Sequence, residues 1–210
     1  MSRALGVVSV VYARHTDPVE QCRAAAADGY AHFDPLLGVD EAALVLPVGC
    51  PTAFPKPVDT WCATPAPAAT LEGAWDRAVR WWRAAPHALL EPWAGACVNS
   101  IETVHAFREA VPGVRLLVDT GHVADWGGDP CELLALADHV QVRQGKPGQP
   151  QVHVDDSSGV IDFAAVFRAL DALDYRGKLS VEYFDLPDRG WPLADPEAWA
   201  RSLRDSLERL

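Results

Sequence analysis

The chain has 210 residues and a mass of 22.7 kDa, which is enough for one sizeable hydrophobic core. It carries 29 acidic and 18 basic residues, a formal net charge of −11, and 49% of its residues are hydrophobic. These values indicate a folded globular protein and exclude nucleic acid and anionic membrane surfaces as first-choice partners. No apolar run is long enough to span a bilayer, no signal-peptide pattern is found, and the five cysteines are scattered without a C-x-x-C pair. We therefore expect a cytoplasmic protein with a single domain over residues 1–210.

Aspartate–proline pairs mark three predicted helix starts, because aspartate caps a helix and proline suits its first turn. The three helices are predicted over 19–27, 131–137 and 197–210. Hydrophobic periodicity and capping residues predict three more, over 71–84, 103–110 and 163–173.

Short apolar runs of strand length lie between these helices. They cover 6–10, 31–34, 43–46, 60–63, 88–91, 115–119, 139–142 and 179–183. Several are apolar at consecutive positions, as in parallel strands that are covered on both faces. The alternation predicts an α/β protein, a compact (β/α)₈ TIM barrel. Four prolines between Pro47 and Pro57 predict reduced helices around the second to fourth strands.

Polar side chains stand at the ends of the last four predicted strands. Their positions are Glu91, Asp119, Gln141 and Glu182. The carboxyl ends of barrel strands converge on one mouth, so we expect these four side chains to meet there. Three carboxylates and an amide oxygen form a hard donor set, which favours Mn²⁺ or Mg²⁺, with Zn²⁺ or Co²⁺ as alternatives.

Ordered motifs in residues 87–185 resemble one known family. They are Leu89-Leu-Glu91-Pro92, Leu116-Leu-Val-Asp119-Thr-Gly-His122, and the stretch from Gly159-Val-Ile-Asp-Phe163 to Val181-Glu182-Tyr183. These motifs are similar to those of the xylose-isomerase-like barrel superfamily, which includes sugar isomerases, epimerases and family-2 AP endonucleases.

The resemblance implies a role for each matching residue. Glu91, Asp119 and Glu182 fall where the family has three metal carboxylates. Gln141 replaces the second histidine of an H-x-H strand, as in members similar to hydroxypyruvate isomerase. His122 matches a histidine on the substrate side of the family's site.

The strand around Gln141 also departs from the family pattern. Arg143-Gln144 stands where the family has Lys-Asp, which leaves the substrate contacts of this strand open. We expect substrate-binding residues among the set His122, His139, Arg143, Trp93 and Trp126.

Two carboxylates on opposite sides of a metal-chelated hydroxy-carbonyl compound can remove a proton and return it through an enediolate. Glu91 and Glu182 are the predicted acid/base pair. The favoured function is a metal-dependent isomerase or epimerase that acts on a small sugar or hydroxy-carbonyl substrate. The alternatives are a dehydratase of the inosose type and a non-catalytic binding protein on the same fold. AP-endonuclease activity is disfavoured by the charge of −11. The oligomeric state stays open, and a homodimer would cover the shortened first half of the barrel.

Overall fold

The computed structural model describes residues 3–34, 64–65, 68–85 and 88–210. Its seven strands form one sheet in the order β2-β1-β7-β6-β5-β4-β3, in which every neighbouring pair is parallel. The strands are β1 (Leu5–Val8), β2 (Phe33–Asp34), β3 (Thr64–Pro65), β4 (Leu89–Glu91), β5 (Arg115–Asp119), β6 (His139–Val142) and β7 (Lys178–Val181).

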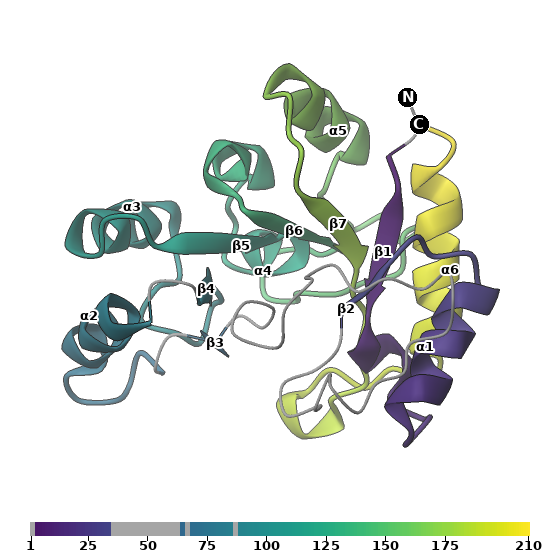
Figure 1. Cartoon of the computed structure of the whole chain (residues 1–210), viewed down its shortest axis with the longest axis horizontal. Coiled ribbons are helices and arrows are strands. Elements are labelled where there is room, and N and C mark those ends of the chain that lie inside the picture. Colours follow the sequence, from purple (N-terminus) through teal and green to yellow (C-terminus); the bar gives the residue numbers. More distant parts are fainter. Residues whose placement is uncertain (1–2, 35–63, 66–67, 86–87) are drawn as a thin grey trace.

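Helices connect the strands. The α-helices are α1 (Pro18–Ala27), α2 (Ala74–Ala84), α3 (Ile101–Ala110), α4 (Thr120–Asp125), α5 (Phe163–Ala172) and α6 (Pro196–Leu207). Helices α1, α2, α3, α5 and α6 lie around the outside of the curved sheet, and α4 lies nearer the middle of the view beside β5 and β6 (Figure 1). Short 3₁₀ helices cover Ser9–Tyr12, Pro130–Glu132, Leu134–Leu136 and Pro187–Arg189. Helix, parallel strand and crossover repeat as predicted, which confirms the (β/α)₈ class.

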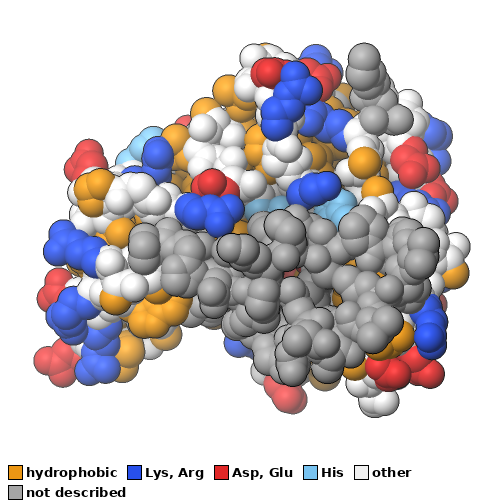
Figure 2. Space-filling view, in the orientation of Figure 1, with side chains coloured by type: hydrophobic (Ala, Val, Ile, Leu, Met, Phe, Trp, Pro, Cys, Tyr) orange, Lys and Arg blue, Asp and Glu red, His pale blue; other side chains and the backbone are white. Residues whose placement is uncertain are grey.

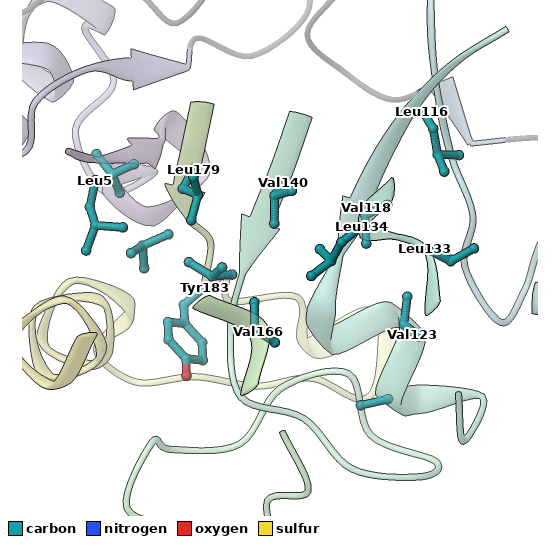
Figure 3. Packing of buried hydrophobic residues seen from close by; sticks show 14 of the residues in the cluster. Leu5, Leu116, Val118, Val123, Leu133, Leu134, Val140, Val166, Leu179 and Tyr183 are labelled. Atoms are coloured by element: carbon teal, nitrogen blue, oxygen red, sulfur yellow. The ribbon is translucent and has the colours of Figure 1, made fainter. Parts of the chain in front are cut away.

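Alternation along each strand separates an apolar face from a polar one. The apolar side chains meet the helices in one large buried cluster, of which Figure 3 shows Leu5, Leu179, Val140 and Val118 beside Val166 of α5. The opposite face of the sheet carries the buried polar residues, among them Asp34, Asp119, His139, Gln141 and Ser180. The sheet therefore holds its functional groups on the inner side of the barrel.

The aspartate caps form as predicted. Asp17, Asp129, Asp162 and Asp195 each accept a backbone N–H of the turn that follows. The predicted α-helix over 131–137 is wrong in kind, because two 3₁₀ helices occupy this stretch. Helix α4 was not predicted, since its first five residues are all buried and give no amphipathic pattern.

The strands predicted at 43–46 and 60–63, and the reduced helices around them, lie outside the described residues. The described strand β3 follows directly after the second of these stretches and pairs with β4. Within the described part of the chain, none of the helices has the length and apolar character needed to cross a membrane.

Candidate functional site

Strand register places the predicted polar residues at one edge of the sheet. Asp119 of β5 pairs with Gln141 of β6, and Gln141 pairs with Ser180 of β7. Glu91 ends β4, and Glu182 follows the last residue of β7. These positions are the carboxyl ends of four neighbouring strands, as the sequence predicted. The arrangement brings side chains that are up to 91 residues apart onto one inner surface.

Asp119 is the most enclosed of the acidic groups, with a side chain that is 0% exposed. Its Oδ1 accepts hydrogen bonds from the backbone N–H groups of Gly121 and His122, at 2.8 and 3.2 Å. Asp119 is thus the cap of α4 as well as a site residue. Burial by itself would raise its pKa, but the charge of Arg143 and the neighbouring His122 hold the pKa of Asp119 below its usual value.

Arg143 lies inside the acidic cluster, directly after the last residue of β6 and two residues beyond Gln141. Its guanidinium is fully buried and contacts two carboxylates. The Nη2 to Oδ2 distance to Asp119 is 2.5 Å, and the Nη1 to Oε2 distance to Glu182 is 3.2 Å. Arg143 is therefore a component of the carboxylate cluster and has no exposed surface through which to act as a free cation at the mouth.

Both glutamates of the cluster have raised pKa values. Burial, followed by repulsion from Asp119, raises the pKa of Glu91 to about 8, although the Arg143 charge opposes this shift. Burial also raises the pKa of Glu182 well above its usual value, with Arg143 opposing and with Asp119 and Glu91 adding to the rise. Burial is the largest cause for both glutamates and the neighbouring carboxylates add to it, so a cation at this place would favour the ionised forms.

His122 lies beside the cluster on α4. Its Nε2 is 3.6 Å from Glu91 Oε1 and 4.0 Å from Asp119 Oδ2. Burial and repulsion by Arg143 lower the pKa of His122 to about 3, so its ring is neutral at physiological pH. A neutral imidazole can bind a metal or hydrogen-bond a substrate oxygen.

The donor set suits a hard divalent ion. Single ligand atoms of Glu91, Asp119 and His122 lie within 4.8 Å of one another. Gln141 Oε1 is buried and has no hydrogen-bond partner among the residues that the structure describes. A buried acceptor without a donor is costly, and it marks a place where a cation or a substrate donor would be stabilised.

Aromatic rings surround His122 at the mouth. The ring centroids of Trp93 and Trp191 are each 6.3 Å from that of His122. Phe184 packs against Trp191 at 5.7 Å, and the exposed Arg189 lies over Trp93 at 5.3 Å. Figure 2 shows basic and histidine side chains near the middle of this view, with most acidic side chains towards its outline.

The structure separates the two tryptophans that were predicted to bind substrate. Both rings pack against the main apolar core, but Trp93 also contacts the ring of His122, whereas Trp126 follows α4 and has no such contact among the described residues. Sequence reasoning missed Trp191, Phe184 and Arg189. Their position after β7, on the same side as the other loops of the mouth, is the signal that could have found them.

His139 lies one layer deeper than Gln141 on β6. Its Nε2 is 3.0 Å from Oδ2 of Asp34, and both side chains are almost completely buried. Nε2 of His32, the residue before β2, lies 3.0 Å from the hydroxyl of Ser180 on β7. His139 and Asp34 thus form a buried polar pair next to the strand ends that carry the site.

Comparisons with known proteins agree with this architecture. A family model described as xylose isomerase-like TIM barrel matches residues 48–210. An inosose dehydratase of Geobacillus kaustophilus (strain HTA426) is 30% identical over 139 residues, which are 56% of this chain and 44% of that enzyme. The match therefore spans less than half the length of this relative.

Solved structures extend the similarity to the whole fold. An L-ribulose 3-epimerase has a TM-score of 0.67 at 17% identity, covering 99% of this chain and 93% of that one. A D-allulose 3-epimerase from Methylomonas sp. has a TM-score of 0.65 at 16% identity, covering 100% and 98%. At these identities the likeness concerns the fold alone. With a family model that matches most of its length, the chain belongs to the xylose isomerase-like TIM barrel family.

Proposed function

We propose that this protein is a divalent-metal-dependent isomerase or epimerase of a small sugar or hydroxy-carbonyl compound. The observation that carries the proposal is the position of Glu91, Asp119 and Glu182 at the carboxyl ends of neighbouring strands, with the unpartnered amide oxygen of Gln141 on the strand between Asp119 and Glu182. The names of the epimerases with the same fold, and of the inosose dehydratase, agree with a sugar-like substrate.

Glu91, Asp119, Gln141 and Glu182 are the residues that would hold the ion, and His122 is close enough to replace one of them. Bound there, a divalent ion would chelate a hydroxy-carbonyl substrate and stabilise the negative charge that develops on its oxygen atoms. We expect Mn²⁺ or Mg²⁺, because oxygen donors predominate.

Glu91 and Glu182 are the proposed acid/base pair. They stand on β4 and after β7, with β5 and β6 between them, so they approach a substrate from opposite sides. One carboxylate takes the proton from the carbon next to the carbonyl, and the electron pair moves onto the carbonyl oxygen. Return of the proton to the neighbouring carbon gives an aldose–ketose isomerase, and return to the same carbon from the other face gives an epimerase.

His122 and the rings of Trp93 and Trp191 are the proposed substrate contacts. The neutral imidazole of His122 can donate to or accept from a hydroxyl group, and aromatic faces pack against the C–H face of a sugar. Arg143 holds the carboxylates of Asp119 and Glu182 in place through its guanidinium, and His139 fixes β6 through its contact with Asp34.

A dehydratase is the second candidate, favoured by the 30% identity to the inosose dehydratase. The first proton transfer would be the same. Loss of hydroxide from the next carbon would then replace return of the proton.

Exchange of substrate hydrogen with solvent tests both candidates. The protein is incubated in D₂O with Mn²⁺ and with ketoses, hydroxypyruvate or an inosose, and NMR follows deuterium at the carbon next to the carbonyl. We expect exchange by the wild type and a loss of at least about a hundredfold in Glu91→Gln and Glu182→Gln. The product distinguishes the reactions, because an isomer or epimer forms in one case and water is lost in the other.

The exposed Glu132→Gln is the matched control, and it should exchange at the wild-type rate. Full exchange by Glu182→Gln with a verified substrate would contradict the acid/base assignment. A wild type without exchange on the whole panel and without bound Mn²⁺ would favour the non-catalytic binding protein.

A further inference from the structure

We propose that Arg143 is an internal cation that holds Asp119 and Glu182 and competes with the divalent ion for them. The inference rests on the metal site of the proposed function and concerns how this chain controls it. Arginine is rarely buried, because removing its charge from water is costly unless anionic partners compensate for it. The fully buried guanidinium of Arg143 has two such partners, Asp119 and Glu182.

The surroundings of Arg143 are shaped to keep it there. Its backbone N–H and C=O are both bonded to the hydroxyl of Thr120, at 3.0 and 2.8 Å. Its guanidinium lies 4.4 Å from the centre of the Phe184 ring. A Cβ at Gly121 would come within 2.6 Å of Arg143 Cγ and 2.7 Å of its Nε, so the glycine leaves the path of the side chain open.

The contacts of Asp119 explain why the arginine competes with an ion. Oδ1 already accepts from Gly121, His122 and the Nε of Arg143, the last at 3.2 Å. Oδ2 faces Nη2 of Arg143 at 2.5 Å. A cation that uses either oxygen has to displace or lengthen a contact with Arg143. The same holds for Glu182 Oε2, which Nη1 approaches to 3.2 Å.

The net charge of the cluster allows a divalent ion to bind even though Arg143 is present. When all three carboxylates are ionised, the single guanidinium of Arg143 leaves two negative charges, which a divalent cation would neutralise. The site can therefore hold its carboxylates together without an ion and still attract one. The consequence is an affinity for divalent ions that is lower than the donor set alone would give.

Binding of Mn²⁺, measured by calorimetry on the folded wild type and on Arg143→Gln, tests the competition directly. We expect Arg143→Gln to bind Mn²⁺ at least about tenfold more tightly, because the ion no longer displaces a buried ion pair. Arg189→Gln is the matched control, since Arg189 is an exposed arginine at the same mouth that lies over Trp93. Its removal should change the affinity by less than about threefold, because exposed charges are screened.

Equal or weaker binding by Arg143→Gln than by the wild type would overturn the competition while leaving the metal site intact. An equal gain in Arg189→Gln would also overturn it, because the effect would then be one of distant charge. If neither the wild type nor Arg143→Gln binds Mn²⁺, both the competition and the proposed function fail.

A measurement on the wild type avoids reliance on the folding of the variant. In protein labelled with ¹⁵N-arginine, the Nε–H signal that is missing in Arg143→Lys belongs to Arg143. We expect this signal to shift as Mg²⁺ is added, because the hydrogen bond to Asp119 is broken or lengthened. An unchanged signal at saturating Mg²⁺ would overturn the proposal.

Discussion

Gly6 on β1 shows how closely the inner polar layer is packed. A Cβ at this position would lie 2.0 Å from Nε2 of His32, which itself lies beside the hydroxyl of Ser180. Glycine is therefore required here for space. The ring of His32 fills the volume that a side chain on β1 would take.

We expect Gly6→Ala to lower the free energy of unfolding by about 1–3 kcal/mol, because the His32 ring has to move. In a His32→Ala background the same substitution should cost less than about 0.5 kcal/mol, because the clash is gone. Urea denaturation of the four proteins measures both values. An equal cost of Gly6→Ala in the two backgrounds would show that His32 is not the obstacle.

His32 also predicts a pH dependence of stability. Burial lowers its pKa from 6.5 to about 4; Asp34 opposes the shift, while His139 and Lys178 add to it. Between these two pH values the unfolded chain binds a proton that the folded protein does not. The contribution of His32 to the free energy of unfolding is therefore complete above pH 6.5. It decreases by up to about 3 kcal/mol as the pH falls towards 4.

Denaturation of the wild type and of His32→Asn between pH 4 and pH 7 measures this term. Asparagine keeps an amide near Ser180 and cannot titrate. We expect stability to fall more steeply with decreasing pH in the wild type than in the variant. If the stability of the two proteins changed with pH in the same way, His32 would not be the source of the pH dependence.

The site could be predicted in part from single residues. Glu91, Asp119 and Glu182 end apolar runs, and this local pattern is enough to place them at the mouth of a parallel barrel. The burial of Arg143 could not be predicted, because its partners are 24 and 39 residues distant and an arginine is normally exposed.

At the scale of elements, helix starts were the most predictable feature. Asp195 caps α6 and accepts a hydrogen bond from the N–H of Ala198 at 3.0 Å. A capping bond involves residues that are neighbours in sequence, so it can be recognised without the fold. Helix α4 depends instead on Asp119 being placed by β5, and the 3₁₀ helices after Asp129 depend on packing against α5.

The cap of α6 also tests how much the surface ion pair beside it contributes. Asp195 Oδ1 lies 2.7 Å from Nη2 of Arg14, and both side chains are about half exposed. We expect Asp195→Ala to lower the free energy of unfolding by about 1 kcal/mol and Asp195→Asn by less than half of that, because asparagine keeps the cap.

Urea denaturation in low salt and in 1 M NaCl measures both variants. The difference between wild type and Asp195→Asn should shrink in high salt, because the exposed ion pair is screened. If Asp195→Asn is as damaging as Asp195→Ala in high salt, the capping bond is not the source of the stability.

At the scale of the whole molecule, the sheet order determines how many strands an ion at the site would hold together, and so how much it would stabilise the native state. Strands β4, β5, β6 and β7 are neighbours, and each provides one of the proposed ligands. The (β/α)₈ class was predictable because strand and helix patterns alternate along the chain. The contacts between inner side chains could not be predicted, because they depend on the register between strands that are far apart in sequence.

An ion bound by four strands should stabilise the fold as a whole, because it binds the native state and not the separated ligands of the unfolded chain. At a free Mn²⁺ concentration about a hundred times the dissociation constant, the gain is about 2.7 kcal/mol, or roughly 5–10 °C in melting temperature for a chain of this size. Thermal unfolding with Mn²⁺ and then with excess chelator measures the shift and its reversal. Glu91→Gln should lose most of the shift, whereas Glu132→Gln should keep it. A shift that survives in Glu91→Gln would place the ion elsewhere on this acidic protein.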